Sequence, residues 1–190
     1  MEKEKSTVPA QDTIPAAMRE VRPFLHLEPA RAAWKDVPVD VVGLARLEAC
    51  VTPSIPQLVR SLVDFTIALQ NRRALERGHA QPIQLSVLNR RRRAARSWLL
   101  AIVGAKADAA TRHAVATQWL PMLAGSGPER ARAVATGRAL IEFVRGAITA
   151  CVFDEPAENL LGHARALHVL ESTLAGHLAG LLDAARTATK

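Results

Sequence analysis

The chain has 190 residues, a formal net charge of +7 at neutral pH and 49% apolar residues. This length suits one domain with a short tail, and the apolar fraction is sufficient for a buried core. No apolar run approaches the length of a membrane span, and the charged N-terminus lacks the apolar segment of a signal peptide. We therefore expect a cytoplasmic protein with no membrane partner. The basic charge suits a nucleic-acid partner, but it also arises from the arginine-rich composition of genomes high in G and C.

Residues 1–38 are polar and rich in proline, which predicts a flexible or partly helical N-terminal arm. From residue 39 to residue 190, apolar residues recur with the helical period, and no segment alternates with a period of two. This pattern favours an all-α domain over residues 39–190, built as a bundle of about six to eight helices.

Capping residues and helix breakers give the expected boundaries. Thr52, Pro53 and Ser54 mark a helix start, Asp108 caps a later helix, and Pro121 and Gly125 break that later helix. The expected helices span residues 39–51, 52–78, 82–104, 108–120, 128–148 and 154–186.

Four leucines in the last helix are spaced by seven residues, and they keep one helix face apolar. They are Leu160, Leu167, Leu174 and Leu181. An apolar face of this kind buries itself against other helices. We predict that the last two helices, from residue 128 to residue 186, form a dimer or partner interface that includes these four leucines.

An arginine cluster is the strongest local charge feature, with Arg90, Arg91, Arg93 and Arg96 on one expected helix. Arg92 falls in the apolar register of that helix, between Leu88 and Ala95. Guanidinium groups in this pattern suit a phosphate or nucleic-acid site. A solvated helix face and a salt-bridged partner interface are the other interpretations. No interleaved aromatics, zinc ligands or helix-turn-helix spacing accompany the cluster, so sequence-specific DNA recognition is not indicated.

No motif predicts catalysis or metal binding. The sequence contains no GxSxG turn, no P-loop lysine and no histidine pair at the i, i+4 spacing of a helical metal site. We therefore expect no catalytic residue, no metal ligand and no enzyme. His113, which lies in mid-helix near Trp119, is the one residue that we retain as a candidate ligand, for a haem iron.

Two segments carry a resemblance to a known family. They are LSVLNRRRRAARSWLLAIVG, residues 85–104, and NLLGHARALHVLESTLAGHLAGLLDA in the last helix. Both are similar to helices of the sensor branch of the globin fold. This branch includes the globin-coupled sensors and the haem-free globin domains at the N-termini of stressosome RsbR-type proteins. The resemblance implies a globin-like arrangement of the helices.

The resemblance also indicates which branch of the family the chain matches. Haem-binding members carry a proximal histidine in a G-x-x-H context where this chain has residues 117–122, TQWLPM, and His113 lies one to two turns too early. The haem-free branch is the better match. It implies a non-enzymatic regulatory or sensory domain that dimerises or binds another protein and needs no cofactor. A nucleic-acid-binding protein that uses Arg90 to Arg96 and a haem sensor that uses His113 are the alternatives.

Overall fold

The computed structural model describes residues 40–76, 83–124, 130–154 and 159–187, so the arm expected over residues 1–38 lies outside the described residues. The described residues are helical and contain no strand, which confirms the all-α fold class. The α-helices are α2 (Val41–Val51), α3 (Ile55–Glu76), α4 (Leu85–Val103), α5 (Ala109–Ala114), α6 (Leu120–Ala124), α7 (Arg130–Phe153) and α8 (Leu160–Thr187). A 3-10 turn (Thr52–Ser54) joins α2 to α3, and a π-helical turn (Val115–Trp119) joins α5 to α6.

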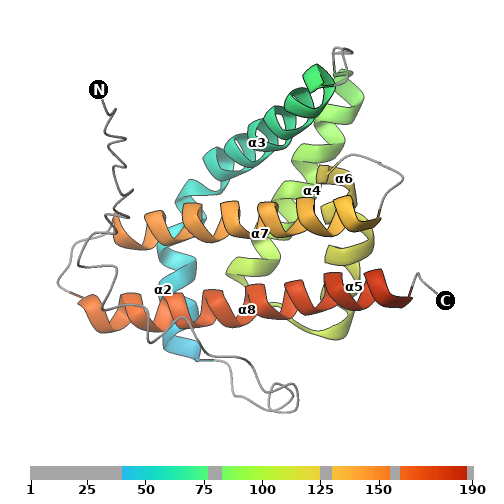
Figure 1. The fold of residues 1–190 in the computed structure, drawn as a ribbon. Coiled ribbons are helices and arrows are strands. Elements are labelled where there is room, and N and C mark those ends of the chain that lie inside the picture. The colour runs from blue at the N-terminus through green and yellow to red at the C-terminus, as the bar shows by residue number, and fades with distance from the viewer. Residues whose placement is uncertain (1–39, 77–82, 125–129, 155–158, 188–190) are drawn as a thin grey trace, which may run out of the picture. The chain divides into compact units, whose positions relative to one another are not determined.

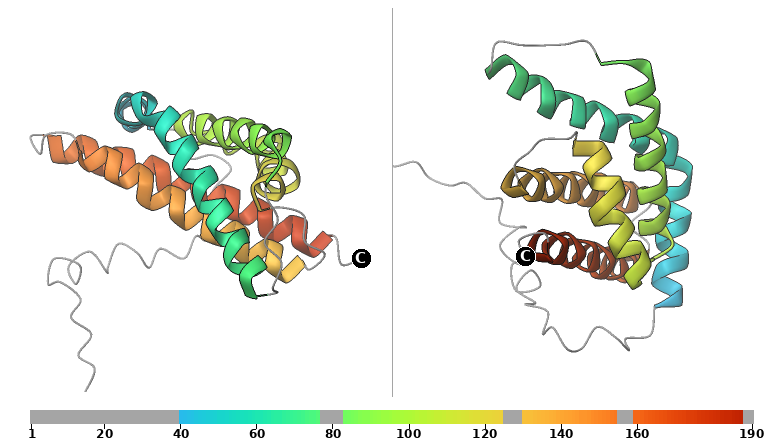
Figure 2. Two further views of the ribbon diagram at one scale, coloured as in Figure 1. Left: turned by 90° about the horizontal axis from the view of Figure 1, so that it is seen from above. Right: turned by 90° about the vertical axis from the view of Figure 1, so that its right-hand side faces the viewer.

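The two longest helices, α7 and α8, run side by side in opposite directions and form one layer (Figure 1). Helices α2, α4 and α5–α6 lie together on one side of this pair, as the view along α7 and α8 shows (Figure 2). Helix α2 packs mainly on α8, and α3 packs mainly on α4. None of the described helices combines the length and the apolarity that a membrane span requires.

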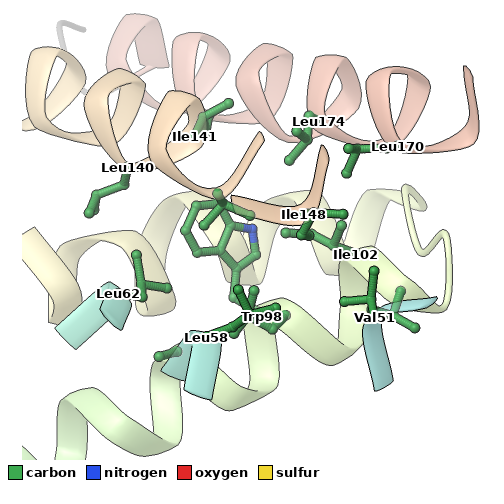
Figure 3. Packing of buried hydrophobic residues seen from close by; sticks show 14 of the residues in the cluster. Val51, Leu58, Leu62, Trp98, Ile102, Leu140, Ile141, Ile148, Leu170 and Leu174 are labelled. Carbon is green, nitrogen blue, oxygen red and sulfur yellow. The ribbon is translucent and has the colours of Figure 1, made fainter. Parts of the chain in front are cut away.

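The core lies between these layers and is centred on Trp98 of α4, whose side chain has no exposed surface. Apolar side chains from α2, α3, α7 and α8 surround its indole ring (Figure 3). Those with no exposed surface include Val51, Leu62, Leu140, Ile148, Leu170 and Leu174. Each buried leucine or isoleucine side chain stabilises the fold by about 1.5–3 kcal/mol. This shared core, more than helix propensity, holds the helices in place.

An aspartate fixes the start of α2 and joins it to α8. The Asp40 carboxylate accepts hydrogen bonds from the backbone N–H groups of Val42 and Gly43, as an N-cap does. The same carboxylate pairs with Arg165 of α8, whose Nε lies 2.7 Å from Oδ2 and whose Nη2 contacts Oδ1. The hydrogen bonds from Arg165, and next the one from Gly43, lower the pKa of Asp40 to about 2. One side chain therefore both caps a helix and clamps it to its neighbour.

The two helices approach each other closely beside this clamp because residue 43 is a glycine. A Cβ atom at Gly43 would lie 2.7 Å from the backbone carbonyl oxygen of Arg165. Since the neighbour is backbone, a side chain at this position can be accommodated only if α2 moves away from α8. The glycine therefore permits the short α2–α8 distance that the ion pair bridges.

Helix α4 ends in a left-handed residue, but it is Ala105 and not the glycine before it. The backbone N–H of Lys106 donates to the Ala101 carbonyl at 2.8 Å, and that of Ala105 donates to the Ile102 carbonyl at 2.9 Å. This is the Schellman arrangement, in which the left-handed position usually holds glycine. Ala105 has φ +49°, while Gly104 has φ −79°. The expected end near Gly104 is correct, and the strained residue is its neighbour.

The helix does not break at Pro121, the first of the two residues expected to end it, and the second, Gly125, lies outside the described residues. The backbone N–H of Leu120 donates to the carbonyl of Val115, five residues back, so the helix widens into a π turn before the proline. Pro121 then falls in the first turn of α6, where the N–H that proline lacks is not needed. The helix continues through Pro121 as far as Ala124.

Candidate functional site

The arginine cluster divides between the surface and the interior of the domain. Arg90, Arg92, Arg93 and Arg96 of α4 are exposed, whereas Arg91 is only 4% exposed. The prediction that Arg91 shares a binding surface with Arg90, Arg93 and Arg96 is therefore wrong. The register inferred for Arg92 is also wrong, because Arg91 takes the buried position. Four consecutive arginines sweep through most of a helical turn, so one of them must point inward.

Buried Arg91 links three helices. Its Nη2 donates to Oε1 of Gln70 on α3 at 2.6 Å, and Nε2 of Gln70 donates to the carbonyl oxygen of Ala124 at the end of α6 at 3.4 Å. Burial lowers the pKa of the Arg91 guanidinium. Its Nε and Nη1 have no hydrogen-bond partner within the described part of the chain. This arginine holds α3, α4 and α6 together and is not available to a ligand at the surface.

The four exposed arginines of α4 make no ion pair with an acidic side chain among the described residues. Helix α4 itself contains no aspartate or glutamate. Among residues 40–76, 83–124, 130–154 and 159–187, the ion pairs are made by Arg145, Arg165 and Arg186, and none involves an exposed arginine of α4. The surface of α4 therefore carries positive charge that the described residues do not neutralise.

A hollow of about 300 Å³ lies beside this surface, between α4 and the π turn with α6. Helix α4 supplies arginines, a serine and an alanine to its wall, and the π turn and α6 supply an amide, an indole ring and a thioether. The lining residues are Arg90, Arg93, Ala94, Ser97, Gln118, Trp119 and Met122. The sequence shows no aromatic residue among the arginines because Trp119 comes from another helix and is brought there only by the fold.

His113 does not lie in this hollow. It is exposed on α5, and its backbone carbonyl accepts a hydrogen bond from the hydroxyl of Thr117. An axial haem ligand works inside a pocket whose polarity and access the protein controls. An exposed ring does not fit that role, so the described residues give no support to His113 as a haem ligand.

A different histidine is an integral part of the core. His177 of α8 has no exposed surface, and its Nδ1 accepts a hydrogen bond from Nε1 of Trp98 at 3.2 Å. Its Nε2 lies 2.9 Å from the carbonyl oxygen of Lys106. The indole can only donate, so Nδ1 is the acceptor and Nε2 carries the proton. Burial lowers the pKa of His177, which keeps the ring neutral. His177 therefore has a structural role in the core, and no local sequence motif predicts that role.

The four heptad leucines do not form one exposed stripe. Leu174 has no exposed surface and Leu181 is 6% exposed, because both pack in the domain's own core. Leu167 is half-buried against that core, and only Leu160, at 67%, is freely exposed. As a dimer interface this set is therefore wrong for Leu174 and Leu181, whose apolar surface is already covered by α7 and its neighbours.

The described residues contain no group of three or more histidine, cysteine, aspartate or glutamate side chains that could hold a metal ion. Comparisons with models of protein families, with curated proteins and with solved structures find no match for this chain. The exposed arginines of α4 and the adjoining hollow are therefore the features of the described residues that suggest a binding function.

Proposed function

We propose that this is a non-enzymatic regulatory domain that binds an acidic protein partner through the outer face of α4. We define this outer α4 face by Leu85, Arg92, Arg96 and Leu100. The observation that carries the proposal is that Arg92 and Arg96 are exposed with no carboxylate partner among the described residues, between two exposed leucines.

Helical spacing places these four side chains on one face. Counting from Leu85, the other three follow at seven, eleven and fifteen residues, which brings them within a narrow sector of the helix surface. Leu85 is 69% exposed and Leu100 is 47% exposed. Along the helix, the outer α4 face thus carries two central arginines flanked by two leucines, and it complements an acidic segment with apolar residues at matching positions.

The mixture of groups favours a protein over nucleic acid. Protein interfaces are enriched in arginine and depleted in lysine, and their centres are apolar. Helix α4 contains no lysine. A nucleic-acid backbone would engage the guanidinium groups but would leave the two exposed leucines in water. The acidic protein partner is therefore the better match, and nucleic acid is the alternative that the experiment must exclude.

The experiment compares three fluorescent probes by anisotropy over a range of salt concentrations. Two are helical acidic peptides of equal length and charge, one with leucines along one face and the other with serines in their place. The third is a DNA duplex of arbitrary sequence. We expect the leucine peptide to bind more tightly than the other two probes. The double substitution of Arg92→Gln and Arg96→Gln should abolish its binding.

A matched control separates a specific surface from general charge. Arg60→Gln with Arg138→Gln removes the same charge from exposed positions on α3 and α7. It should leave peptide binding unchanged. Equal loss in both double variants, or tighter binding of the duplex than of the leucine peptide, would contradict the proposal. Failure of the leucine peptide to bind at all would also count against it.

We also propose that the helices follow a globin-like arrangement of the haem-free, sensory kind. In support, the two segments that resemble sensor globins coincide with α4 and α8, and the domain closes with the long antiparallel pair α7 and α8. A crystal structure tests this directly, because its α4, α5–α6, α7 and α8 should superpose on the corresponding helices of a sensor globin. Helices that cross in another order would contradict the arrangement.

A further inference from the structure

The hollow between α4 and α6 has two chemically different walls. The α4 wall carries two guanidinium groups and the hydroxyl of Ser97, and the opposite wall carries the amide of Gln118, the indole ring of Trp119 and the thioether of Met122. No carboxylate from the described part of the chain lines the hollow. A cationic wall facing an aromatic and thioether wall selects a ligand that has an anionic group and a flat apolar part.

The cationic wall is suited to a single anionic group. Arg90 and Arg93 are three residues apart on α4, so their side chains leave the same side of the helix about one turn apart. Both are exposed, and neither takes part in an ion pair among the described residues. Two free guanidinium forks match a group with a charge near −2. A phosphate monoester has that charge at neutral pH, whereas a carboxylate has half of it.

The aromatic wall owes its position to the π turn. A turn that takes in one extra residue rotates everything after it by about 100° about the helix axis, relative to an uninterrupted α-helix. The extra residue of Val115–Trp119 in this way sets the direction of Met122 on α6, and Trp119, the last residue of the turn, lines the same hollow. Trp119 is half-buried and Met122 is 42% exposed, so both have surface available to a ligand.

We propose that this hollow is a binding site for a small aromatic phosphate, of the size of a nucleoside monophosphate. Arg90 and Arg93 bind the phosphate, the ring lies against Trp119 and Met122, and Gln118 and Ser97 donate to or accept from polar atoms on the ligand. The volume of about 300 Å³ is at the lower end of ligand pockets, which limits the ligand to one ring system with one phosphate. The site is independent of the proposed protein-binding surface, because Arg92 and Arg96 do not line it.

The test is calorimetric titration of the whole protein with four probes. Adenosine monophosphate carries ring and phosphate together, adenosine carries the ring alone, inorganic phosphate carries the anion alone, and benzoate joins a ring to a carboxylate. We expect adenosine monophosphate to bind more tightly than each of the other three. Arg90→Gln with Arg93→Gln should weaken its binding by about tenfold or more, since charged hydrogen bonds are lost. Arg92→Gln with Arg96→Gln, which removes the same charge from the same helix, should leave it unchanged.

Tryptophan fluorescence supplies a second readout. The emission of wild-type protein should change on titration with adenosine monophosphate. This change should be lost in Trp119→Phe and kept in Trp34→Phe, and Trp98, the third tryptophan, is fully buried away from the hollow. The substituted arginines are exposed, so these variants should fold.

Inorganic phosphate that binds as tightly as adenosine monophosphate would overturn the assignment of the aromatic wall as a binding site for the ring of the ligand. Equal weakening by the two arginine pairs, or no saturable binding, would overturn the site altogether.

Discussion

Two glycine-to-alanine substitutions in this protein should have opposite effects on stability. Gly43 and Gly146 both lie inside helices, where alanine is favoured over glycine by about 1 kcal/mol. At Gly146 an added Cβ meets no atom within 4 Å. Gly146→Ala should therefore raise the free energy of unfolding by about 1 kcal/mol, since nothing opposes the gain in helix propensity.

At Gly43 the same methyl group would lie 2.7 Å from the Arg165 carbonyl oxygen and 3.0 Å from Oδ2 of Asp40. Overpacking of this kind costs about 1–3 kcal/mol, and a rigid backbone neighbour favours the upper part of that range. After the propensity gain is subtracted, Gly43→Ala should lower the free energy of unfolding by about 1–2 kcal/mol.

Urea unfolding followed by circular dichroism measures both changes, and thermal melts should shift in opposite directions by roughly 2–4 °C per kcal/mol. A double variant should show the sum of the two effects, because the sites have no shared contact in the structure. A stabilising Gly43→Ala, or two changes of the same sign, would refute the close approach of α2 to α8.

Three further predictions concern the core and the end of α4. Trp98→Phe leaves Nδ1 of His177 buried without a hydrogen-bond donor, which should lower the free energy of unfolding by about 1–3 kcal/mol beyond the lost packing. The matched variant Trp119→Phe should lower it by under about 1 kcal/mol. Urea unfolding midpoints of the two variants measure the difference. Folding lowers the pKa of His177 below its ordinary value of 6.5. The neutral ring therefore makes its full contribution to the free energy of unfolding above pH 6.5. That contribution declines as the pH falls below 6.5, because the unfolded chain then takes up a proton that the folded chain does not. His177→Gln, which can make the same two hydrogen bonds, should flatten this decline; a slope equal to that of wild type would show that another group causes it. Ala105→Gly should stabilise the domain by about 0.5–1 kcal/mol because it relieves the strain of the left-handed backbone. The control Ala164→Gly, on the exposed surface of α8, should destabilise the domain by about 1 kcal/mol. Melting temperatures that shift in the same direction in both variants would contradict the strain at Ala105.

Local signals predicted the helices well, because capping is a short-range interaction. Asp108 was expected to cap a helix, and its carboxylate indeed accepts a hydrogen bond from the backbone N–H of Thr111 at 2.8 Å. The end near Gly104 was also correct. Of the two residues expected to end that helix, Pro121 does not interrupt it, and a π turn just before a proline leaves no mark in the spacing of apolar residues. The helix type there is decided by how the segment packs, and the sequence pattern does not contain that information.

The site was less predictable because it depends on which way each residue faces. With four arginines in a row, a small uncertainty in helix register decides whether Arg91 or Arg92 is buried. The pairing of Arg91 with Gln70 joins residues 21 positions apart, and that of Trp98 with His177 joins residues 79 positions apart. The hollow likewise requires Arg93 and Trp119 to come from different helices. Such partners become visible only when the helices are packed.

The leucine spacing in the last helix also could not identify the packing partner of a residue. A heptad pattern shows that a helix face is buried, but it does not show whether the neighbour is the same chain or a second one. Here α7 and the other helices of the domain cover Leu174 and Leu181. For these two leucines the pattern was therefore a correct indicator of burial and an incorrect indicator of an intermolecular interface.

The acid-free surface of α4 also determines how copies of this protein meet one another. In a two-fold symmetric pair each surface patch faces its own equivalent. Two copies joined through α4 would thus bring arginine against arginine, with no carboxylate on the helix to separate them. Like charges repel in this geometry, and the repulsion weakens as salt screens it. Repulsion between the arginines therefore disfavours a two-fold pair through α4 at low ionic strength, and leaves this surface accessible to a partner of opposite charge.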